Sequence, residues 1–438
     1  MINRDLMDIR GDIAHKERTP MGRESWDVIV VGAGPAGSAV SALLAQRGYE
    51  VLVLEREKFP RYHIGESLVP GILPLLDQLG LGDQIDKFGF VKKNGITLRW
   101  GSQREPWTVY FGEVGPIEYA YQVVRSEFDY LLLQNARRLG ATVTEEAEVH
   151  GFIFEDGRCV GVRYESGGRS HEARARISVD ASGQGHLLGR RLGLIEWDEG
   201  LRNVATWAYF EGGELFSGRD AGNILIENMP DGWLWTIPLH DGSKSVGLVA
   251  PASMLRGRSA ASGETLLRAV EASEQTRRLL RSARLASGFR TIRDWSYRCR
   301  SFHGPGFLLA GDAAGFVDPL FSTGVFLALN GGSRAADAAD RILSGRREEE
   351  AAGQEYQDAY GSFLDVVFSF VRYFYDASKD RELYWGRARE LVDPFGRMTA
   401  RQDFVYLISG LGGLPVMELP REDSIFQRPE LTEQVAPV

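Results

Sequence analysis

Three glycines at fixed spacing, Gly32, Gly34 and Gly37, stand between a β-branched run and a helical pattern. In such a unit the first glycine makes a tight turn, the second lets the backbone approach a phosphate, and the third lets helix and strand pack closely. The helix N-terminus offers N–H groups and a partial positive charge to a pyrophosphate. Glu55 ends the next apolar run, where a carboxylate can accept both ribose hydroxyls. The pattern predicts a dinucleotide site; a glycine-rich structural turn is the alternative.

A later segment indicates which dinucleotide is bound. Gly311 and Asp312 follow an apolar run, and a Gly-Asp pair at this place holds the ribityl chain and pyrophosphate in Rossmann-type FAD proteins, whereas an NAD domain needs no such return of the chain. The sequence has no second Gly-x-Gly-x-x-Gly, so a dedicated site for a nicotinamide donor is not evident. We therefore predict FAD, reduced by a separate flavin reductase. From these motifs we expect it at Gly32, Ala33, Gly34, Ala36, Gly37, Glu55, Arg56, Gly311 and Asp312.

Composition limits the class of protein. Of 438 residues, 43% are hydrophobic and 25% charged, which is usual for a globular chain, and the net charge of −9 does not suit a nucleic acid partner. Two cysteines and seven scattered histidines form no disulfide framework and no metal-ligand pattern, so we predict no metal site. No secretory signal is present, and no apolar run approaches the ~20 residues that span a bilayer. We expect a cytoplasmic protein without a membrane span.

The periodicity predicts an α/β fold. Strands are expected at 28–31, 51–54, 142–144, 149–154, 159–164 and 175–180, with helices at 35–46, 70–88 and 128–139. A second, β-rich block covers 94–124 and 204–249, 264–284 looks helical, and the chain is helical from about 345 with a glycine break at 409–413. We predict a Rossmann-type FAD-binding domain interwoven with an antiparallel β-sheet substrate domain, plus C-terminal helices. The expected parts are a flexible tail at 1–24, an FAD-binding module at 25–345 containing the β-rich region (about 94–124 and 200–285), and a helical lid region at 346–438.

Longer motifs give the chain a resemblance to a known family. They are Gly-Glu-Ser-Leu-Val-Pro at 65–70, the lysine-bearing segment 89–101, Trp-Leu-Trp-Thr-Ile-Pro at 233–238, and Phe-x-x-Pro-x-x-Ser-x-Gly at 316–324. Arg-x-x-Phe-Asp at 125–129 and Asp-Ala-Ser-Gly at 180–183 are shared with wider FAD monooxygenases. Over residues 26–420 the chain resembles the flavin-dependent halogenases of natural-product pathways, including the glycopeptide-antibiotic type that acts on carrier-bound tyrosine-like groups. The resemblance adds Ser67, Arg125 and Asp180 to the expected FAD site.

The resemblance implies a reaction in which reduced FAD and O2 oxidise chloride or bromide to hypohalous acid. This acid travels through a tunnel to a lysine beside an electron-rich aromatic substrate. Lys93 matches the family's lysine by its spacing from Phe90 and Gly95, and adjacent strand residues face opposite ways, so Lys92 and Lys93 cannot both line the tunnel. Burial would lower the pKa of Lys93 and make a neutral, nucleophilic amine accessible. A solvated surface lysine is the alternative.

The same resemblance assigns the halide to Thr323 and Gly324, because N–H donors in a tight turn bind a partly desolvated anion. It assigns tunnel lining and shielding to Trp233, Trp235, Phe316, Pro319 and Ser322. The two tryptophans lie on one face if they belong to a strand, and core packing is the alternative. No carboxylate is identifiable from the sequence as a substrate-side base, a need that the acidic O–H or N–H of a phenol or pyrrole lessens.

The substrate and partners are less defined by the sequence. We predict a phenolic group, free or tethered to a carrier protein; the C-terminal region is shorter than in the tryptophan enzymes, which makes free tryptophan a poor candidate. Arginines 277, 278, 281, 284 and 290 form either a solvated helix face or a docking site for an acidic carrier protein. The aromatic-rich helix at 363–375 is core or lid. The sequence does not indicate an oligomeric state.

Three other functions share some of these motifs. An FAD-dependent aromatic monooxygenase or a geranylgeranyl-reductase-like oxidoreductase would contain the glycine turn, Asp180 and the Gly-Asp pair, but would not explain Lys93 or the two tryptophans. A flavoprotein scaffold without turnover is the third.

Overall fold

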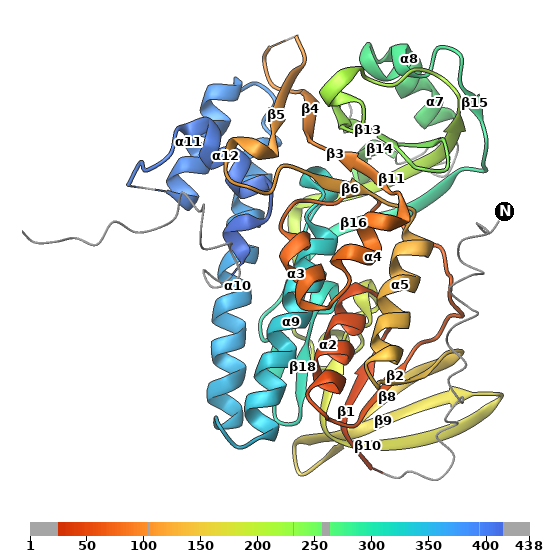
Figure 1. Cartoon of the computed structure of the whole chain (residues 1–438), viewed down its shortest axis with the longest axis vertical. Coiled ribbons are helices and arrows are strands. Elements are labelled where there is room, and N and C mark those ends of the chain that lie inside the picture. Colours follow the sequence, from red (N-terminus) through yellow and green to blue (C-terminus); the bar gives the residue numbers. More distant parts are fainter. Residues whose placement is uncertain (1–24, 104, 231, 256–262, 394, 415–438) are drawn as a thin grey trace, which may run out of the picture.

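The computed structural model describes residues 25–414 except 104, 231, 256–262 and 394. The tail expected at 1–24 and the end of the region expected at 346–438 lie outside the described residues. One sheet lies towards the lower end of the molecule and a second towards the upper end, with helices between and beside them (Figure 1).

The lower sheet is built on the β-branched runs of the sequence. Its order is β17-β18-β10-β1-β2-β7, and all but the first pair are parallel. The strands are β1 (Ser25–Val31), β2 (Val51–Leu54), β7 (Thr142–Thr144), β10 (Arg169–Asp180), β17 (His303–Gly304) and β18 (Phe307–Leu309), extended by the antiparallel strands β8 (Ala147–Glu155) and β9 (Arg158–Ser166). Helices α2 (Pro35–Gln46), α5 (Arg125–Arg138) and α9 (Gly324–Leu343) pack side by side on it. Such cover on a parallel sheet explains why every residue of β2 is buried.

The upper sheet is mostly antiparallel, as expected for the β-rich block. Its order is β19-β16-β11-β14-β13-β12-β4-β5, with β15 beside β11. The strands are β4 (Gly95–Arg99), β5 (Trp107–Tyr110), β11 (Ile195–Glu211), β12 (Ile224–Met229), β13 (Gly232–Pro238), β14 (Ser243–Pro251), β15 (Arg284–Leu285), β16 (Arg290–Cys299) and β19 (Gly315–Phe316). The β4–β12 pair is parallel, so two segments distant in sequence share this sheet. The predicted α/β class, with a Rossmann-type part and an antiparallel sheet, is confirmed.

Two helical segments of the sequence are each divided. The first becomes α3 (Ile72–Gln78) and α4 (Gly82–Phe88), separated at Gly80, whose φ is +69°. The second becomes α7 (Gly263–Ala272) and α8 (Gln275–Leu279). The carboxylate of Glu227, from β12, accepts the backbone N–H groups of residues 274, 275 and 276 and so defines where α8 begins. This long-range contact leaves no mark in the local periodicity, which is why the sequence suggested one continuous helix.

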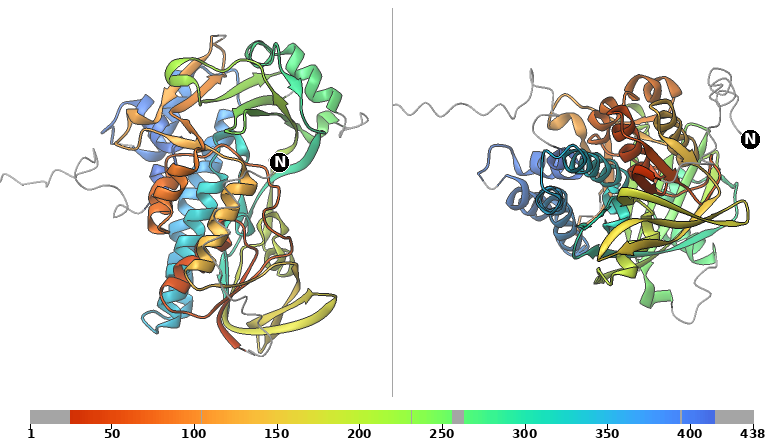
Figure 2. Two further views of the ribbon diagram at one scale, coloured as in Figure 1. Left: turned by 45° about the vertical axis from the view of Figure 1, so that its right-hand side comes forward. Right: turned by 90° about the horizontal axis from the view of Figure 1, so that it is seen from below.

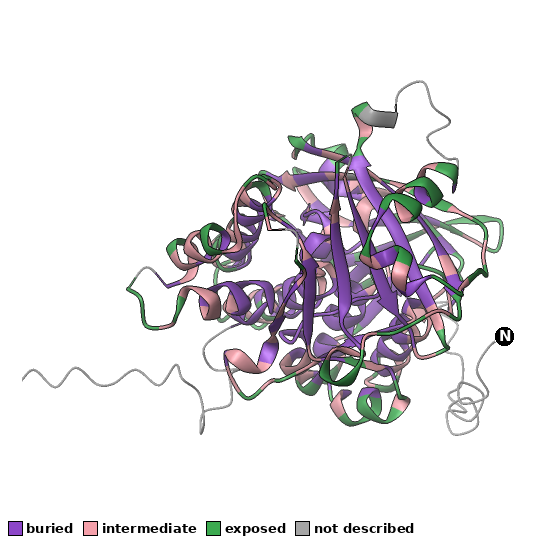
Figure 3. Ribbon diagram, turned by 90° about the horizontal axis from the view of Figure 1, so that it is seen from above, coloured by how far each residue is buried: buried purple, intermediate pink, exposed green. Residues whose placement is uncertain are grey.

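The C-terminal helices are α10 (Glu349–Phe374), α11 (Arg381–Val392) and α12 (Ala400–Ile408), with α10 running alongside α9 (Figure 2). Phe370 and Phe374 of the aromatic stretch are buried and pack on Phe321 and Phe404. Figure 3 shows that burial is concentrated in the strands and in the helix faces turned towards them. This end of α10 is therefore core. None of the described helices is both long and apolar enough to cross a bilayer.

Candidate active site

The three glycines of the first motif have three different surroundings. Gly32 has φ +97°, and a Cβ there would lie 2.5 Å from the carbonyl oxygen of Ala181. A Cβ on Gly37 would lie 1.9 Å from the oxygen of Gly32, so this contact admits no side chain. Around Gly34, at the N-terminus of α2, the nearest atom to an added Cβ is Nη2 of Arg61 at 3.4 Å. The open space therefore lies where helix N–H groups can bind a phosphate.

The expected ribose-binding residue lies beside this turn. Glu55, at the end of β2, is 5% exposed, and its Oε2 accepts the N–H of Ala33 at 2.7 Å while Oε1 accepts the N–H of Glu57 at 2.9 Å. These bonds hold the carboxylate against the glycine turn. Arg56 is exposed at the rim, with its Nε 3.7 Å from Glu57.

The second motif comes to the same edge of the sheet. Gly311 has φ +63°, and a Cβ there would lie 2.8 Å from Cβ of Ala36, so the Gly-Asp turn packs directly on α2. Burial raises the pKa of Asp312 to about 6, and the charge of Arg125 opposes this rise. Asp180 ends β10 and accepts the N–H groups of residues 182 and 188. This edge, with an open phosphate cradle, a buried acid and the return of the chain, fits FAD.

Arg125 organises the segment that precedes the lysine. Its guanidinium makes two bonds to Asp129, of 2.8 and 2.9 Å, and donates to the carbonyl oxygens of Ile64 and Gly65 at 2.7 and 3.2 Å. The 64–67 segment is thereby tied to the start of α5. The structure places Ser67 not on this arginine but on Lys93.

Lys93 is fully buried at the end of the short strand β3 (Val91–Lys93), which pairs with β6 (Ala120–Gln122). Its Nζ donates to Oγ of Ser67 at 2.7 Å and to the carbonyl oxygen of Leu68 at 2.9 Å. Burial lowers the pKa of Lys93 to about 7. Lys92 points to solvent, 2.6 Å from Asp86. The surface-lysine alternative is wrong for Lys93, because no part of this residue is exposed.

Trp233 and Trp235 share one face of β13, with ring centroids 6.0 Å apart. Both are buried, and both indole N–H groups are bonded: Trp233 to the hydroxyl of Tyr375 at 2.9 Å and Trp235 to Oγ of Ser245 at 3.1 Å. The pair therefore packs in the core between sheet and C-terminal helix, a position compatible with both of the roles that the sequence left open.

The 316–324 motif forms a chain of short turns that ends at a helix N-terminus. Phe316 pairs with β16 in β19, Pro319 begins a 3-10 turn, and Ser322 has φ +61°. Thr323 is buried and precedes α9, and a Cβ on Gly324 would find no atom within 4 Å. No side chain caps this end of α9, whose residues are all described. Unpaired N–H groups of a 20-residue helix thus face open space, as an anion site requires.

A buried carboxylate holds this turn in place. Asp318 accepts the N–H of Leu320 at 3.1 Å through Oδ1, while Oδ2 accepts the amide of Asn203 at 2.9 Å and the hydroxyl of Tyr375 at 2.6 Å. The pKa of Asp318 is raised to about 6, because the effect of burial outweighs the opposing effect of these hydrogen bonds. Because Tyr375 also accepts from Trp233, one hydroxyl links the turn, the upper sheet and the end of α10.

Glu66 is a residue that sequence reasoning missed. It is 3% exposed, and burial raises its pKa to about 7. Its Oε1 accepts the hydroxyl of Tyr209 at 2.6 Å, and hydrogen bonds from Ser245 and Tyr209 oppose the rise in its pKa. The sequence identified no carboxylate as a substrate-side base, and the structure adds Glu66 as a candidate because it directly precedes Ser67, which contacts Lys93. In the sequence, Glu66 lies between a glycine and an apolar run, and this position was the available signal that its carboxyl is buried.

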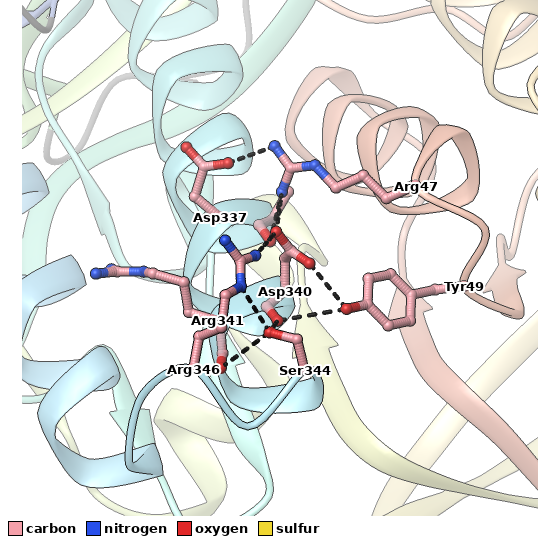
Figure 4. Close-up of polar contacts among 8 residues, drawn as sticks. Arg47, Tyr49, Asp337, Asp340, Arg341, Ser344 and Arg346 are labelled. Carbon is pink, nitrogen blue, oxygen red and sulfur yellow. Dashed lines mark hydrogen bonds and ion pairs between the residues drawn. The ribbon is translucent and has the colours of Figure 1, made fainter.

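Two other polar regions lie outside this site. Of the arginine run, three side chains face carboxylates on Glu271, Glu214 and Glu211, which favours a solvated face. At the end of α9 opposite Gly324 a cavity of about 300 Å³ is lined by charged residues (Figure 4). Its charges pair with one another, for example Arg346 with Asp340 and Arg341 with Glu355, each at 2.5 Å. Among the described residues no group of three or more His, Cys, Asp or Glu could hold a metal.

The parallel sheet, the glycine turn, the buried acid and the Gly-Asp return define a Rossmann-type FAD-binding protein. Residues 27–116 and 113–403 match the tryptophan halogenase family model, and the chain belongs to this family. It is 35% identical to Tryptophan 2-halogenase of Chondromyces crocatus over 375 residues, covering 84% of this chain and 71% of that protein. It is also 35% identical to sulochrin halogenase gedL of Aspergillus terreus (strain NIH 2624 / FGSC A1156) over 381 residues, covering 79% and 69%.

Among solved structures, the myxobacterial chondrochloren halogenase CndH, a variant of FAD-dependent halogenases, superposes with a TM-score of 0.79. The two share 35% sequence identity over 90% of this chain and 99% of that one. The protein is thus a flavin-dependent halogenase with FAD as its cofactor, and the halogenase prediction is confirmed.

Proposed function

We propose that this halogenase uses O2 and chloride or bromide to halogenate an electron-rich aromatic substrate, with Lys93 as the residue that receives the oxidised halogen. FAD, supplied in reduced form by a separate flavin reductase, provides the electrons and the oxygen chemistry that generate hypohalous acid. The observation that carries the proposal is the buried, solvent-free amine of Lys93, whose pKa is lowered to about 7.

The chemistry of Lys93 depends on its protonation state. An ordinary lysine at pH 7 is neutral in roughly one molecule in 2,500, whereas a lysine of pKa about 7 is neutral in about half. The two protonation states suit two different roles. Only the neutral amine has a lone pair with which to take a halogen from hypohalous acid, whereas the protonated amine can orient the acid by donating a hydrogen bond. Ser67 and Leu68 hold Nζ in place for either role.

The N-terminus of α9 is the proposed halide site. Thr323 and Gly324 stand at the uncapped helix end with open space above the glycine, and a halide is satisfied by N–H donors alone. Trp233 and Trp235 are proposed to keep water away from the path between this end and Lys93.

The proposed substrate is phenolic, free or tethered to a carrier protein. The ionisable O–H of a phenol activates the ring, and the buried carboxyl of Glu66 provides an acid–base group beside Ser67. The relatives are named for different substrates, tryptophan and sulochrin, so this choice rests on the site alone. Ion pairing within the arginine run lends carrier docking little support.

The test needs no substrate. The protein is loaded anaerobically with reduced FAD, mixed with O2, and followed by flavin absorbance with and without chloride or bromide. We expect halide to change the rate of flavin reoxidation. We also expect an oxidising halogen species, detected with a trapping reagent, to persist on the wild-type protein but not on Lys93→Met. Lys92→Met is the matched control, because the neighbouring lysine is exposed. Halide-independent reoxidation, or direct reduction of bound FAD by NADPH, would instead favour monooxygenase or reductase chemistry.

A further inference from the structure

A row of hydrogen-bonded hydroxyl groups leads from Glu66 to the protein surface. Glu66 Oε1 accepts the hydroxyl of Tyr209 at 2.6 Å, and the Tyr209 and Tyr62 hydroxyl oxygens lie 2.9 Å apart. Tyr209 is half-buried, and Tyr62 is 39% exposed. The row therefore joins a carboxyl that is 3% exposed to a residue in contact with solvent.

The donors and acceptors around the two tyrosines give this row a direction, and Trp207 holds its outer hydroxyl. Its indole nitrogen can only donate, and it donates to the hydroxyl oxygen of Tyr62 at 2.6 Å. Because the single hydroxyl proton of Tyr209 is donated to Glu66, the hydrogen bond between the two tyrosines must use the proton of Tyr62. With Glu66 ionised, every donor in the row points inwards, which is the arrangement in which a proton supplied at the surface can move to the carboxylate by successive transfers.

We infer that Tyr62 and Tyr209 form a path along which a proton moves from solvent to the carboxylate of Glu66. A proton taken up at Tyr62 displaces the Tyr62 proton to Tyr209, and the Tyr209 proton passes to Oε1 of Glu66. Both tyrosines finish neutral and Glu66 finishes as a carboxylic acid. The guanidinium of Arg290, 3.9 Å from the ring centroid of Tyr62, covers the outer end of the row.

Glu66 adjoins the side chains that contact Lys93 and Trp235. The next residue, Ser67, contacts Nζ of Lys93, and the adjacent hydroxyl of Ser245 accepts the indole N–H of Trp235. Besides these hydroxyls, the charged groups acting on Glu66 are Arg125 from α5, which favours its ionised form, and Asp241 from the β13–β14 turn, which disfavours it.

The role of this proton path in catalysis rests on the proposed function. Complete turnover consumes one proton, which is taken up when halide is oxidised to hypohalous acid: ArH + X⁻ + O2 + FADH2 + H⁺ gives ArX + FAD + 2 H2O. A site that excludes water must import this proton, and the buried carboxyl of Glu66 is the group from which it would leave.

The first experiment uses the resting protein with oxidised FAD and is independent of halogenation. The carbonyl band of protonated Glu66, assigned by its loss in Glu66→Gln, is followed by infrared spectroscopy after a rapid jump from pH 8.5 to 6. We expect Tyr62→Phe to keep the endpoint but to slow protonation by about tenfold or more. Tyr62 is the decisive position, because its hydroxyl does not touch the carboxyl. Tyr49→Phe, which removes a hydroxyl bonded to Asp340, is the control. Protonation of Tyr62→Phe and Tyr209→Phe at the wild-type rate overturns the path.

The second experiment measures turnover. In Tyr62→Phe we expect kcat at pH 8 to fall by about tenfold with an unchanged KM for halide, and small acids such as imidazolium to restore it. A fall in kcat that small acids do not restore would mean that Tyr62 is merely structural. If the wild-type protein does not halogenate at all, the proposed function fails, while the infrared measurement still decides whether the path exists.

Discussion

Replacing the buried lysine by an apolar residue of similar shape should change how the stability of the protein depends on pH. A lysine whose pKa is lowered from 10.5 to about 7 is neutral in the folded protein and charged in the unfolded chain between these two values. Folding then releases a proton, and the free energy of unfolding rises with pH across this window. Below pH 7 the folded protein carries the buried charge and the gain is absent.

The magnitude follows from the two pKa values. Relative to a chain without this group, wild-type protein is destabilised by about 4 kcal/mol at pH 7 and by about 2 kcal/mol at pH 9. The difference in unfolding free energy between Lys93→Met and wild type should therefore shift by about 2 kcal/mol in favour of wild type between these two pH values. Loss of the bonds to Ser67 and Leu68 costs Lys93→Met about 1–3 kcal/mol, but that loss does not depend on pH.

The assay is urea unfolding of both proteins, followed by tryptophan fluorescence at pH 7, 8 and 9 with saturating FAD. Taking the difference between the two proteins cancels the titration of all other groups. Lys92→Met should run parallel to wild type, since Lys92 is exposed in the fold. Equal pH slopes for Lys93→Met and wild type would refute the claim that burial keeps this amine near neutrality, and with it the main support for its proposed role.

Three further predictions test the rest of the site. Gly34→Ala should fold and bind FAD at least about tenfold more weakly, whereas Gly37→Ala should fail to fold stably because its Cβ meets a carbonyl oxygen at 1.9 Å; circular dichroism and FAD titration separate the two. Glu55→Gln should weaken FAD binding by about 1–3 kcal/mol, measured by fluorescence titration, and a wild-type affinity would contradict the ribose assignment. Tyr375→Phe should lower unfolding free energy by about 1–3 kcal/mol and weaken halide binding, because Asp318 loses a donor and the turn loses its link to α10; unchanged halide affinity would limit Tyr375 to a structural role.

The glycine turn and Glu55 could be predicted from the sequence because this part of the cofactor site is local. A strand, a glycine turn, a helix and an acid within thirty residues form one βαβ unit, and the same backbone constraints apply in every such unit. The backbone has the form that this unit requires, with a positive φ at Gly32 and close packing of Gly37 on the Gly32 carbonyl. Many strands of both sheets were also predicted from β-branched and alternating patterns, but β16 (Arg290–Cys299) was not.

Lys93 was located by sequence, but its environment was not. Its neighbours explain why: β3 is three residues long, and the groups that bury and bond its amine come from Ser67, Leu68 and Phe111. A pKa near 7 is a property of this enclosure, so a solvated lysine and a reactive lysine look alike until the chain is folded.

The sequence by itself thus determined the class of fold and the cofactor, because those depend on backbone geometry and side-chain type within motifs, and its resemblance to the halogenases singled out Lys93. Only the tertiary structure decided that Glu66 is a buried acid connected to solvent through Tyr209 and Tyr62, and that Tyr375 ties Asp318 to Trp233. Those contacts join residues more than fifty positions apart, and the physical quantities that matter there, desolvation and donor direction, exist only once the strands and helices have packed.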